Sequence, residues 1–377
     1  MDHVAIVGAS LAGVTAAGAL RDEGYGGAIT LLGDEPHPPY NRPQLSKDVL
    51  AGEAGRTAPT PVALPDGIDL RLGVRALSLD PIASVISLSN GQQLAYDGLV
   101  IATGARARAL APPGLKGERV LRSLDDCLAL RRALAAARSV LVVGGGFLGM
   151  EIASTCRALG LTVTVLSRDP PVAQLGAALS HFLGQAARQA GVRWVDSPGG
   201  VVFEGVDTVD GVRDSQDVVH RADVIVTAAG CQPNLEWLQD SGLLSAGRLL
   251  IDRQGRVAER IVAAGDVVAF RATADAPYAR LPFWANAQAQ ARTAARALVH
   301  GSDIAPAVVH PYFWTDQFGH SIRLCGVLPS FEPTAVEGSL DEGRALLRWS
   351  EGGVTVAVAA VNKRMPITRL SALLDPA

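Results

Sequence analysis

A strand, a glycine-rich turn and a helix follow one another twice in this chain, and this repeat limits the folds open to it. The two copies span residues 3–13 and 140–149, and their first turn glycines, Gly8 and Gly144, lie 136 positions apart. Each copy continues into an alanine-rich helical stretch and then a β-branched run, at 28–32 and 162–166. The repeat therefore predicts an α/β protein with two Rossmann-like dinucleotide-binding domains.

Glycine in such a turn allows the backbone to approach a pyrophosphate, which then rests on the N–H groups and positive end of the helix. A single turn of this kind is often merely a tight connection, whereas two copies within βαβ units favour nucleotide binding. Ser10 stands in place of the middle glycine of the first turn. The residues predicted to line the turns are Gly8, Ser10, Leu11, Ala12 and Gly13, and then Gly144, Gly146, Phe147, Leu148 and Gly149.

Composition narrows the class of protein further. With 377 residues, 48% of them hydrophobic and 19% charged, the chain can bury two or three cores. The net charge of −3 does not suit a nucleic-acid partner. The longest apolar stretch, near residues 140–150, is broken by glycines and falls short of the roughly 18 residues of a membrane span. Because the amino terminus also lacks a signal-peptide pattern, we expect a cytoplasmic protein with no membrane partner.

Cysteine and histidine usage predicts no metal site. The four cysteines are far apart without metal-type spacing, and we expect them to be small buried side chains: Cys127, Cys156, Cys231 and Cys325. The seven histidines show no H-x-x-x-H pattern. The absence of a G-x-S-x-G signature argues against a hydrolase.

Proline-rich and strand-rich segments indicate the domain boundaries. Residues 36–43 are rich in proline and can form neither a regular helix nor a central strand, so we expect an ordered loop there, and another at 58–67. From Pro306 the pattern changes to short strands and a final short helix, which predicts a third, α+β domain. The expected strands are 321–327, 344–350 and 354–361.

Three further segments resemble those of flavoproteins with two dinucleotide-binding domains. Residues 96–106 are similar to the strand and turn that close the flavin domain, and residues 261–266 to the strand whose terminal aspartate holds the ribityl chain of FAD. Residues 229–234 resemble the exit from the nicotinamide domain. This resemblance implies an FAD-binding domain of residues 1–110 and 235–305, an NAD(P)-binding domain of residues 111–234, and a C-terminal domain of residues 306–377.

Within that superfamily the chain resembles the ferredoxin reductases of bacterial oxygenase and cytochrome P450 systems. The likeness lies in residues 40–47, 283–288 and 311–317 and extends from residue 4 to about 370. It implies FAD, a nicotinamide nucleotide and an iron–sulfur ferredoxin of the 2Fe-2S type. No pair of cysteines is spaced as a redox dithiol, so electrons are expected to leave directly from the flavin.

The resemblance also implies residues that contact FAD. Glu35, or its neighbour Asp34, can accept hydrogen bonds from the adenosine ribose, although either could be an ordinary loop acid. Arg42 and Arg122 match positions at the adenine and pyrophosphate end. The other positions expected at the flavin nucleotide are Ala76, Thr103, Gly104, Arg106 and Asp266.

Four residues match positions at the reacting groups. Lys47 matches a lysine beside flavin N5, where its charge favours negative charge on the reduced ring. Glu151 matches an acid that faces the nicotinamide, and the two could form an ion pair that opens when the nucleotide docks. For Glu151 the alternative is an acid in the first helical turn, stabilised by the dipole. Trp284 and Trp314 match aromatic walls near the flavin, and a helix is expected from near Trp284 to Val299.

The nucleotide choice depends on the strand at 162–166. Relatives that use NADH usually carry an acid at its end, where this chain has Ser167 followed by Arg168. Loss of the acid and gain of an arginine favour NADPH over NADH, because the guanidinium can bind a 2′-phosphate. Arg168 could instead be an ordinary exposed arginine, with either nucleotide tolerated. Gly230 is also expected at this nucleotide.

The chain departs from the family pattern at Asn41 and Gln44, which replace an aspartate and a proline of the flavin-side loop. Two alternatives stay open, and these departures motivate the first of them. One is a diaphorase or tailoring flavoenzyme whose reduced FAD acts directly on a small molecule. The other is a nucleotide-sensing protein without turnover, against which the retention of Lys47, Glu151 and Asp266 argues.

Overall fold

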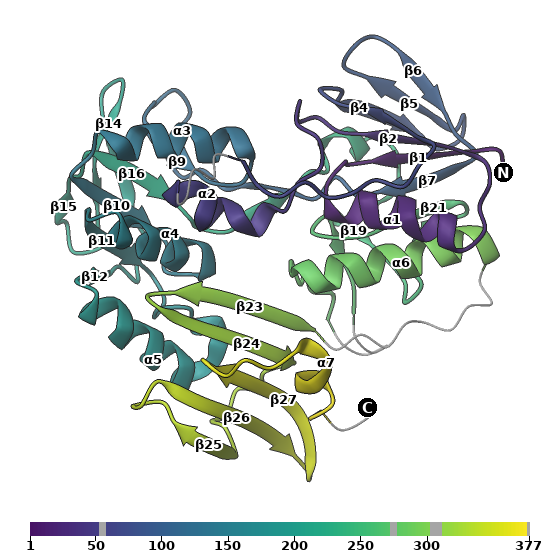
Figure 1. The fold of residues 1–377 in the computed structure, drawn as a ribbon. Coiled ribbons are helices and arrows are strands. Elements are labelled where there is room, and N and C mark those ends of the chain that lie inside the picture. Colours follow the sequence, from purple (N-terminus) through teal and green to yellow (C-terminus); the bar gives the residue numbers. More distant parts are fainter. Residues whose placement is uncertain (53–57, 272–276, 302–310, 375–377) are drawn as a thin grey trace. The chain divides into compact units, whose positions relative to one another are not determined.

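The computed structural model describes residues 1–52, 58–271, 277–301 and 311–374, which form two compact units (Figure 1). The first unit comprises Met1–Asn41, Thr60–Arg106 and Gln232–Pro311. The second comprises Arg42–Pro59, Ala107–Cys231 and Tyr312–Ala377. Residues 42–59 therefore pack in the second unit, although they fall in the range predicted for the first domain. The predicted boundary at residues 305 and 306 lies outside the described residues.

The first unit is built on a six-stranded sheet with one nearly continuous apolar core on each face. Its order is β20 (Arg256–Ala258), β21 (Ile261–Ala263), β7 (Gly98–Ile101), β1 (His3–Val7), β2 (Ala28–Leu32) and β3 (Ile68–Arg71). All neighbours are parallel except β20 and β21. Because both faces are covered, β1 and β7 read as unbroken apolar runs rather than alternating ones.

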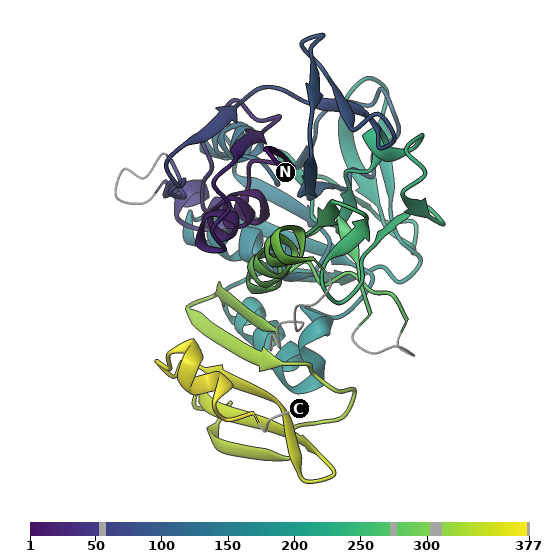
Figure 2. The same ribbon diagram turned by 90° about the vertical axis from the view of Figure 1, so that its right-hand side faces the viewer.

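Two helices cover one face of this sheet and short strands cover the other (Figures 1 and 2). Helices α1 (Leu11–Asp22) and α6 (Trp284–His300) pack against each other through small side chains such as Ala16 and Ala291. The opposite face holds β4 (Ala76–Asp80), β5 (Val85–Leu88) and β6 (Gln93–Ala95), together with β18 (Leu244–Ser245), β19 (Arg248–Leu250) and β22 (Val268–Ala269).

The second unit repeats the architecture on a five-stranded parallel sheet. Its order is β12 (Arg193–Asp196), β11 (Thr162–Ser167), β10 (Ser139–Val143), β16 (Val224–Thr227) and β9 (Glu118–Val120). Its helices are α3 (Leu124–Ala135), α4 (Phe147–Ala158) and α5 (Gly176–Gln189), and β13 (Val202–Gly205), β14 (Val209–Arg213) and β15 (Val219–His220) form a meander. The prediction of two Rossmann-like domains is therefore confirmed.

A five-stranded antiparallel sheet near the C-terminus also belongs to the second unit. Its order is β23 (Tyr312–Gln317), β24 (His320–Gly326), β27 (Val354–Val361), β26 (Arg344–Glu351) and β25 (Ala335–Ser339). One face packs on α5 and the other on α7 (Ile367–Ser371). The three expected strands and the final helix are present, whereas β23 and β25 were not predicted.

The loops differ from expectation in one respect. Residues 36–41 contain no helix, and Tyr40 forms an isolated bridge with Pro61, as an ordered loop requires. A 3-10 helix, η1 (Arg42–Ser46), nevertheless begins inside the predicted loop and leads into α2 (Asp48–Ala51). Proline at its second position is compatible with this start, because its missing N–H would be unpaired there anyway.

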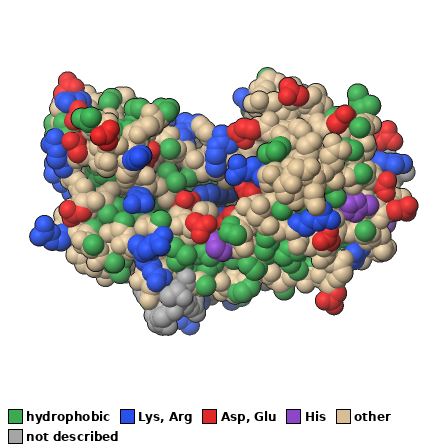
Figure 3. Space-filling model, turned by 90° about the horizontal axis from the view of Figure 1, so that it is seen from above, with side chains coloured by type: hydrophobic (Ala, Val, Ile, Leu, Met, Phe, Trp, Pro, Cys, Tyr) green, Lys and Arg blue, Asp and Glu red, His purple; other side chains and the backbone are tan. Residues whose placement is uncertain are grey.

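The cysteine prediction was wrong at one position. Cys127, Cys156 and Cys325 are buried, but Cys231 is only partly buried. Within the described ranges, no helix is long and apolar enough to cross a membrane. The described residues also bring together no cluster of three or more His, Cys, Asp or Glu side chains suited to a metal ion. On the face drawn in Figure 3, basic and acidic side chains are interspersed.

Candidate functional site

Four of the turn glycines are required by the fold itself. In the first unit, a Cβ on Gly8 (φ +118°) would lie 2.1 Å from the Ala102 carbonyl oxygen, and one on Gly13 would lie 1.9 Å from the Gly8 oxygen. The second unit repeats the geometry, since a Cβ on Gly149 would lie 1.9 Å from the Gly144 oxygen. A side chain at these positions would separate each helix from its sheet.

The positions just before the helices are the two N-caps, Gly146 and Ser10. Gly146 is the N-cap of α4, with extended backbone, and nothing lies within 4 Å of where its Cβ would be. Ser10 is the equivalent N-cap of α1. The first turn of an α-helix presents backbone N–H groups that the helix itself leaves unbonded. Here these groups belong to Leu11 and Ala12 in α1 and to Phe147 and Leu148 in α4. The second turn, with glycine at its N-cap, therefore leaves the helix N–H groups accessible to a pyrophosphate, whereas the first turn carries the small Ser10 side chain at the equivalent position.

The turn after β7 is held by a residue that the sequence prediction missed. Thr103 Oγ1 donates to the Asn234 carbonyl oxygen (2.9 Å), and Asn234 Nδ2 donates back to the Thr103 oxygen (2.9 Å). Arg106 donates to the Asn234 side chain (3.1 Å) and pairs with Glu236 (2.6 Å). Gly104 has φ +64° and open space at its Cβ position. Asn234 lies within the segment 229–234 that carries the resemblance, and this was the available signal.

Asp266 follows β21 in a turn that is fixed by α6 and by Arg280. Gln290 Oε1 accepts the Gly265 N–H (2.9 Å), and Arg280 donates to the Asp266 carbonyl oxygen (2.9 Å). Neither residue was predicted. Helix α6 begins at Trp284, as expected, and the Trp284 side chain is 36% exposed.

The remaining positions predicted for the flavin nucleotide lie in two places. Glu35 accepts a hydrogen bond from the Tyr40 hydroxyl (2.6 Å), whereas Asp34 is exposed. Ala76 is buried at the start of β4. In the second unit, Arg42 Nη1 donates to the Arg122 carbonyl oxygen (2.6 Å), so these two arginines lie together.

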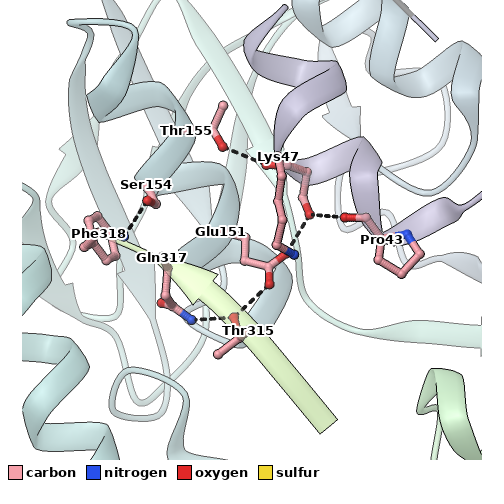
Figure 4. A network of polar contacts seen from close by, with 9 residues as sticks. Pro43, Lys47, Glu151, Ser154, Thr155, Thr315, Gln317 and Phe318 are labelled. Atoms are coloured by element: carbon pink, nitrogen blue, oxygen red, sulfur yellow. Dashed lines mark hydrogen bonds and ion pairs between the residues drawn. The ribbon is translucent and has the colours of Figure 1, made fainter. Parts of the chain in front are cut away.

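Lys47 and Glu151 form the predicted ion pair, with 2.7 Å between Nζ and Oε2 (Figure 4). The side chain of Glu151 is 9% exposed and that of Lys47 is 20% exposed. Ser46 Oγ donates to the same carboxylate oxygen (2.6 Å), and Thr315 Oγ1 donates to the other (2.7 Å). Gln317 Nε2 donates in turn to Thr315 Oγ1 (2.9 Å). These donors replace the water that a buried carboxylate loses.

The elements that meet at this carboxylate are all in the second unit. Lys47 is the N-cap of α2, Glu151 lies in the first two turns of α4, and Thr315 lies in β23. Figure 4 shows β23 passing directly beside α4. Sequence reasoning predicted the ion pair but missed Ser46, Thr315 and Gln317. Thr315 and Gln317 lie in segment 311–317, where the resemblance implied a role only for Trp314.

The N-terminal half of β23 carries three aromatic side chains, those of Tyr312, Phe313 and Trp314. Phe313 packs against Phe147 at the start of α4, with 4.0 Å between ring centroids. Trp314 stacks on Tyr312 at 5.8 Å. Trp314 therefore stacks with Tyr312 on one face of β23, whereas Phe313 reaches the start of α4 from the other face.

The end of β11 shows how Ser167 is used. Its hydroxyl accepts the Gly145 N–H (3.1 Å) and donates to the Asp169 carbonyl oxygen (2.8 Å), so it ties the glycine turn to the strand end. Arg168 is 71% exposed and pairs with the Asp169 carboxylate (3.1 Å). Gly230 has φ +93° and open space at its Cβ position.

Comparison with known proteins agrees with the observed fold. The family described as Pyridine nucleotide-disulphide oxidoreductase matches residues 2–291, and the family described as Reductase C-terminal matches residues 312–376. The chain therefore belongs to the pyridine nucleotide-disulphide oxidoreductase family, whose cofactors are FAD and a nicotinamide nucleotide.

Individual relatives place it more closely. It is 38% identical over 375 residues to the biphenyl dioxygenase system ferredoxin–NAD(+) reductase component of Paraburkholderia xenovorans (strain LB400), covering 95% of this chain and 90% of that one. The ferredoxin reductase for the CYP199A2 system from Rhodopseudomonas palustris superposes with a TM-score of 0.86 at 31% identity, over 96% and 91% of the two chains. The putidaredoxin reductase–putidaredoxin complex gives a TM-score of 0.85 at 31% identity, over 96% and 90%.

Proposed function

We propose that this protein is an FAD-dependent ferredoxin reductase that passes electrons from NAD(P)H one at a time to an iron–sulfur ferredoxin, which in turn supplies an oxygenase or cytochrome P450. The single observation that carries the proposal is the Lys47–Glu151 pair, held in a buried polar network beside the second glycine turn. Support also comes from the relatives, which are named as ferredoxin reductase components.

FAD, when bound, accepts a hydride from the reduced nicotinamide and releases its two electrons singly. The chain contributes binding, orientation and charge. The first glycine turn, Glu35, Arg42, Arg122 and the Thr103–Gly104 turn would hold the flavin nucleotide, and Asp266 would hold its ribityl chain. Lys47 would provide positive charge near the flavin, and Glu151 would contact the nicotinamide. Trp284 of the first unit and Trp314 of the second would each supply an aromatic side chain to the flavin.

The thiols support direct transfer from the flavin. None of the four cysteines forms a disulfide. Burial raises the pKa of Cys127 to about 11 and that of Cys156 to about 12, so neither is a thiolate at neutral pH. A dithiol relay, such as disulfide reductases require, has no candidate pair. The electron acceptor in this proposal is a ferredoxin of the 2Fe-2S type.

NADPH is the proposed reductant in preference to NADH. Support comes from the residues alone: Ser167 leaves no acid at the end of β11 to repel a 2′-phosphate, and Arg168 is exposed next to it. The Asp169 carboxylate, 3.1 Å from Arg168, opposes this preference, and the relatives are named for NAD(+). A kcat/KM for NADPH above that for NADH supports the proposal, and a strong NADH preference overturns it.

An anaerobic titration tests the function. The FAD-loaded protein is mixed with NADPH or NADH while the flavin absorbance is followed, and then with a 2Fe-2S ferredoxin and cytochrome c. Prompt bleaching, followed by cytochrome c reduction that requires the ferredoxin, is expected. Bleaching with rapid NAD(P)H oxidation without ferredoxin would identify a diaphorase instead. A loaded protein that neither nucleotide bleaches would refute both.

A further inference from the structure

The carboxylate of Glu151 accepts hydrogen bonds from three protein side chains. Lys47 and Ser46 donate to Oε2 at 2.7 and 2.6 Å. Thr315 Oγ1 donates to Oε1 at 2.7 Å and is the partner that comes from the C-terminal sheet. Thr315 is fully buried and Glu151 is 7% exposed. A hydroxyl that donates to a buried carboxylate forms one of the stronger protein hydrogen bonds.

Gln317 fixes the direction of the Thr315 hydroxyl. A threonine hydroxyl has one proton, and an amide nitrogen can only donate. Because Gln317 Nε2 donates to Thr315 Oγ1 (2.9 Å), the threonine proton is directed to Glu151. The opposite amide orientation would present two acceptors, Gln317 Oε1 and Glu151 Oε1, to this one proton. Gln317 Oε1 is buried and has no hydrogen-bond partner among the described residues. The side chain therefore leaves its oxygen unpaired and uses Nε2 to donate to Thr315.

The backbone of β23 holds both side chains on one face of the strand. Thr315 and Gln317 are two residues apart and therefore point the same way, paired with Ile322 and His320 in β24. At the hairpin tip the Phe318 N–H donates to Ser154 Oγ (2.6 Å), which lies in α4 one turn after Glu151. Strand β23 is thus joined to α4 at two points, and the register of Thr315 against Glu151 is fixed.

We propose that Thr315, oriented by Gln317, is a positioning residue that holds the Glu151 carboxylate in the geometry required for hydride transfer. Strand β23 thereby controls a group that lies in the Rossmann domain. When nucleotide docking opens the Lys47–Glu151 pair, Thr315 and Ser46 keep the carboxylate oriented and hydrogen-bonded. This inference rests on the proposed function, because it assigns the orientation of Glu151 a role in the reductive half-reaction.

Rapid-mixing kinetics with the preferred nucleotide test the role in transfer. Thr315→Val keeps the shape of the side chain and removes the hydroxyl donor, whereas Thr315→Ser keeps the donor. Thr368→Val, at an exposed position of α7, is the control. We expect Thr315→Val to slow the limiting rate of flavin reduction about tenfold, with the nucleotide Kd changed by less than about twofold. Thr315→Ser and Thr368→Val are expected to stay within about twofold of native. Equal rates for Thr315→Val and the native protein would overturn the proposal.

A double-mutant cycle on the FAD-loaded protein, at one fixed concentration of free FAD, supplies a readout independent of turnover. Thr315→Val is expected to raise the equilibrium constant of urea unfolding about tenfold in the native background and less than about twofold in a Glu151→Met background. Equal effects in both backgrounds would refute the contact. If Thr315→Val does not fold, Gln317→Met decides, since it leaves Thr315 present but unoriented and should slow reduction about threefold. A native protein that no nucleotide reduces would refute the proposed function, whereas an additive cycle would refute the contact alone.

Discussion

Two glycines of the second turn should respond in opposite ways to the same added methyl group. At Gly146 the Cβ position is open, so Gly146→Ala should leave the free energy of unfolding within about 1 kcal/mol of native. The same methyl occupies the space that a pyrophosphate would take in front of α4. Loss of a charge-assisted bond from a backbone N–H costs about 1.5–3 kcal/mol, so the nucleotide should bind at least about tenfold more weakly.

At Gly149 the added Cβ would lie 1.9 Å from the Gly144 carbonyl oxygen. An ordinary C···O contact is about 3.3 Å, so the turn and helix must separate by about 1.4 Å. Overpacking of this size in a close helix–strand contact should destabilise the unit by about 3 kcal/mol or more. The same substitution therefore tests binding at one glycine and folding at the other.

Urea unfolding followed by circular dichroism gives the stabilities, and calorimetric titration with the nicotinamide nucleotide gives Kd. Gly26→Ala is a matched control, because Gly26 has open space at its Cβ position and lies in the first unit, outside both turns. It should change neither quantity. Native affinity in Gly146→Ala, or native stability in Gly149→Ala, would refute the assignment of open and closed glycines.

Three further results are expected. Lys47→Met leaves Glu151 buried with only neutral donors and should lower the free energy of urea unfolding by about 3 kcal/mol. The double variant Lys47→Met/Glu151→Gln should lose less stability, and equal losses in the two variants would contradict this explanation. Cys231 should react first with iodoacetamide at pH 8, read by mass spectrometry, since the other thiols are buried; fast labelling that persists in Cys231→Ser would disprove it. Burial lowers the pKa of His320, so as pH falls the unfolded chain takes up this proton at a higher pH than the folded protein does. The free energy of unfolding should therefore decrease below about pH 6.5. His320→Asn should make Tm depend less on pH between 7 and 5, and an unchanged dependence of Tm on pH would count against this cause.

The parts of the fold that follow local rules could be predicted from the sequence. A glycine whose Cβ would lie 2.1 or 2.5 Å from a carbonyl oxygen tolerates no other residue, so Gly8 and Gly144 marked both βαβ units reliably. Strands β2 and β27 were predicted with their observed bounds because both are long runs of apolar and β-branched residues.

Strand β23 could not be predicted, because its buried half carries polar side chains. Thr315 and Gln317 occupy inward positions where a sheet normally places apolar residues, and they do so because Glu151 accepts the Thr315 hydroxyl, which in turn accepts the Gln317 amide N–H. Strand β25 was missed for the opposite reason, since its residues are almost all exposed and show no apolar alternation. In both strands the tertiary partner, and not the local pattern, decides the structure.

The repeat predicted the glycine turns of the candidate site, but the other side chains of the site were predictable only where the resemblance named a residue. Lys47 and Glu151 were expected to pair, and they do. Ser46 and Asn234 are common residue types whose roles depend on a partner more than 100 positions away in the chain, 105 for Ser46 and 131 for Asn234. No periodicity or spacing rule carries information over that distance.

The network around Glu151 also sets an order of events during synthesis. Ser46 precedes Glu151 by 105 residues, but Thr315 follows it by 164. At about 5–20 residues per second, a ribosome would deliver this last donor roughly ten to thirty seconds after the carboxylate. A nascent Rossmann domain must therefore leave Glu151 in contact with water during that interval, and the site should become functional only when the final sheet has been translated and has docked.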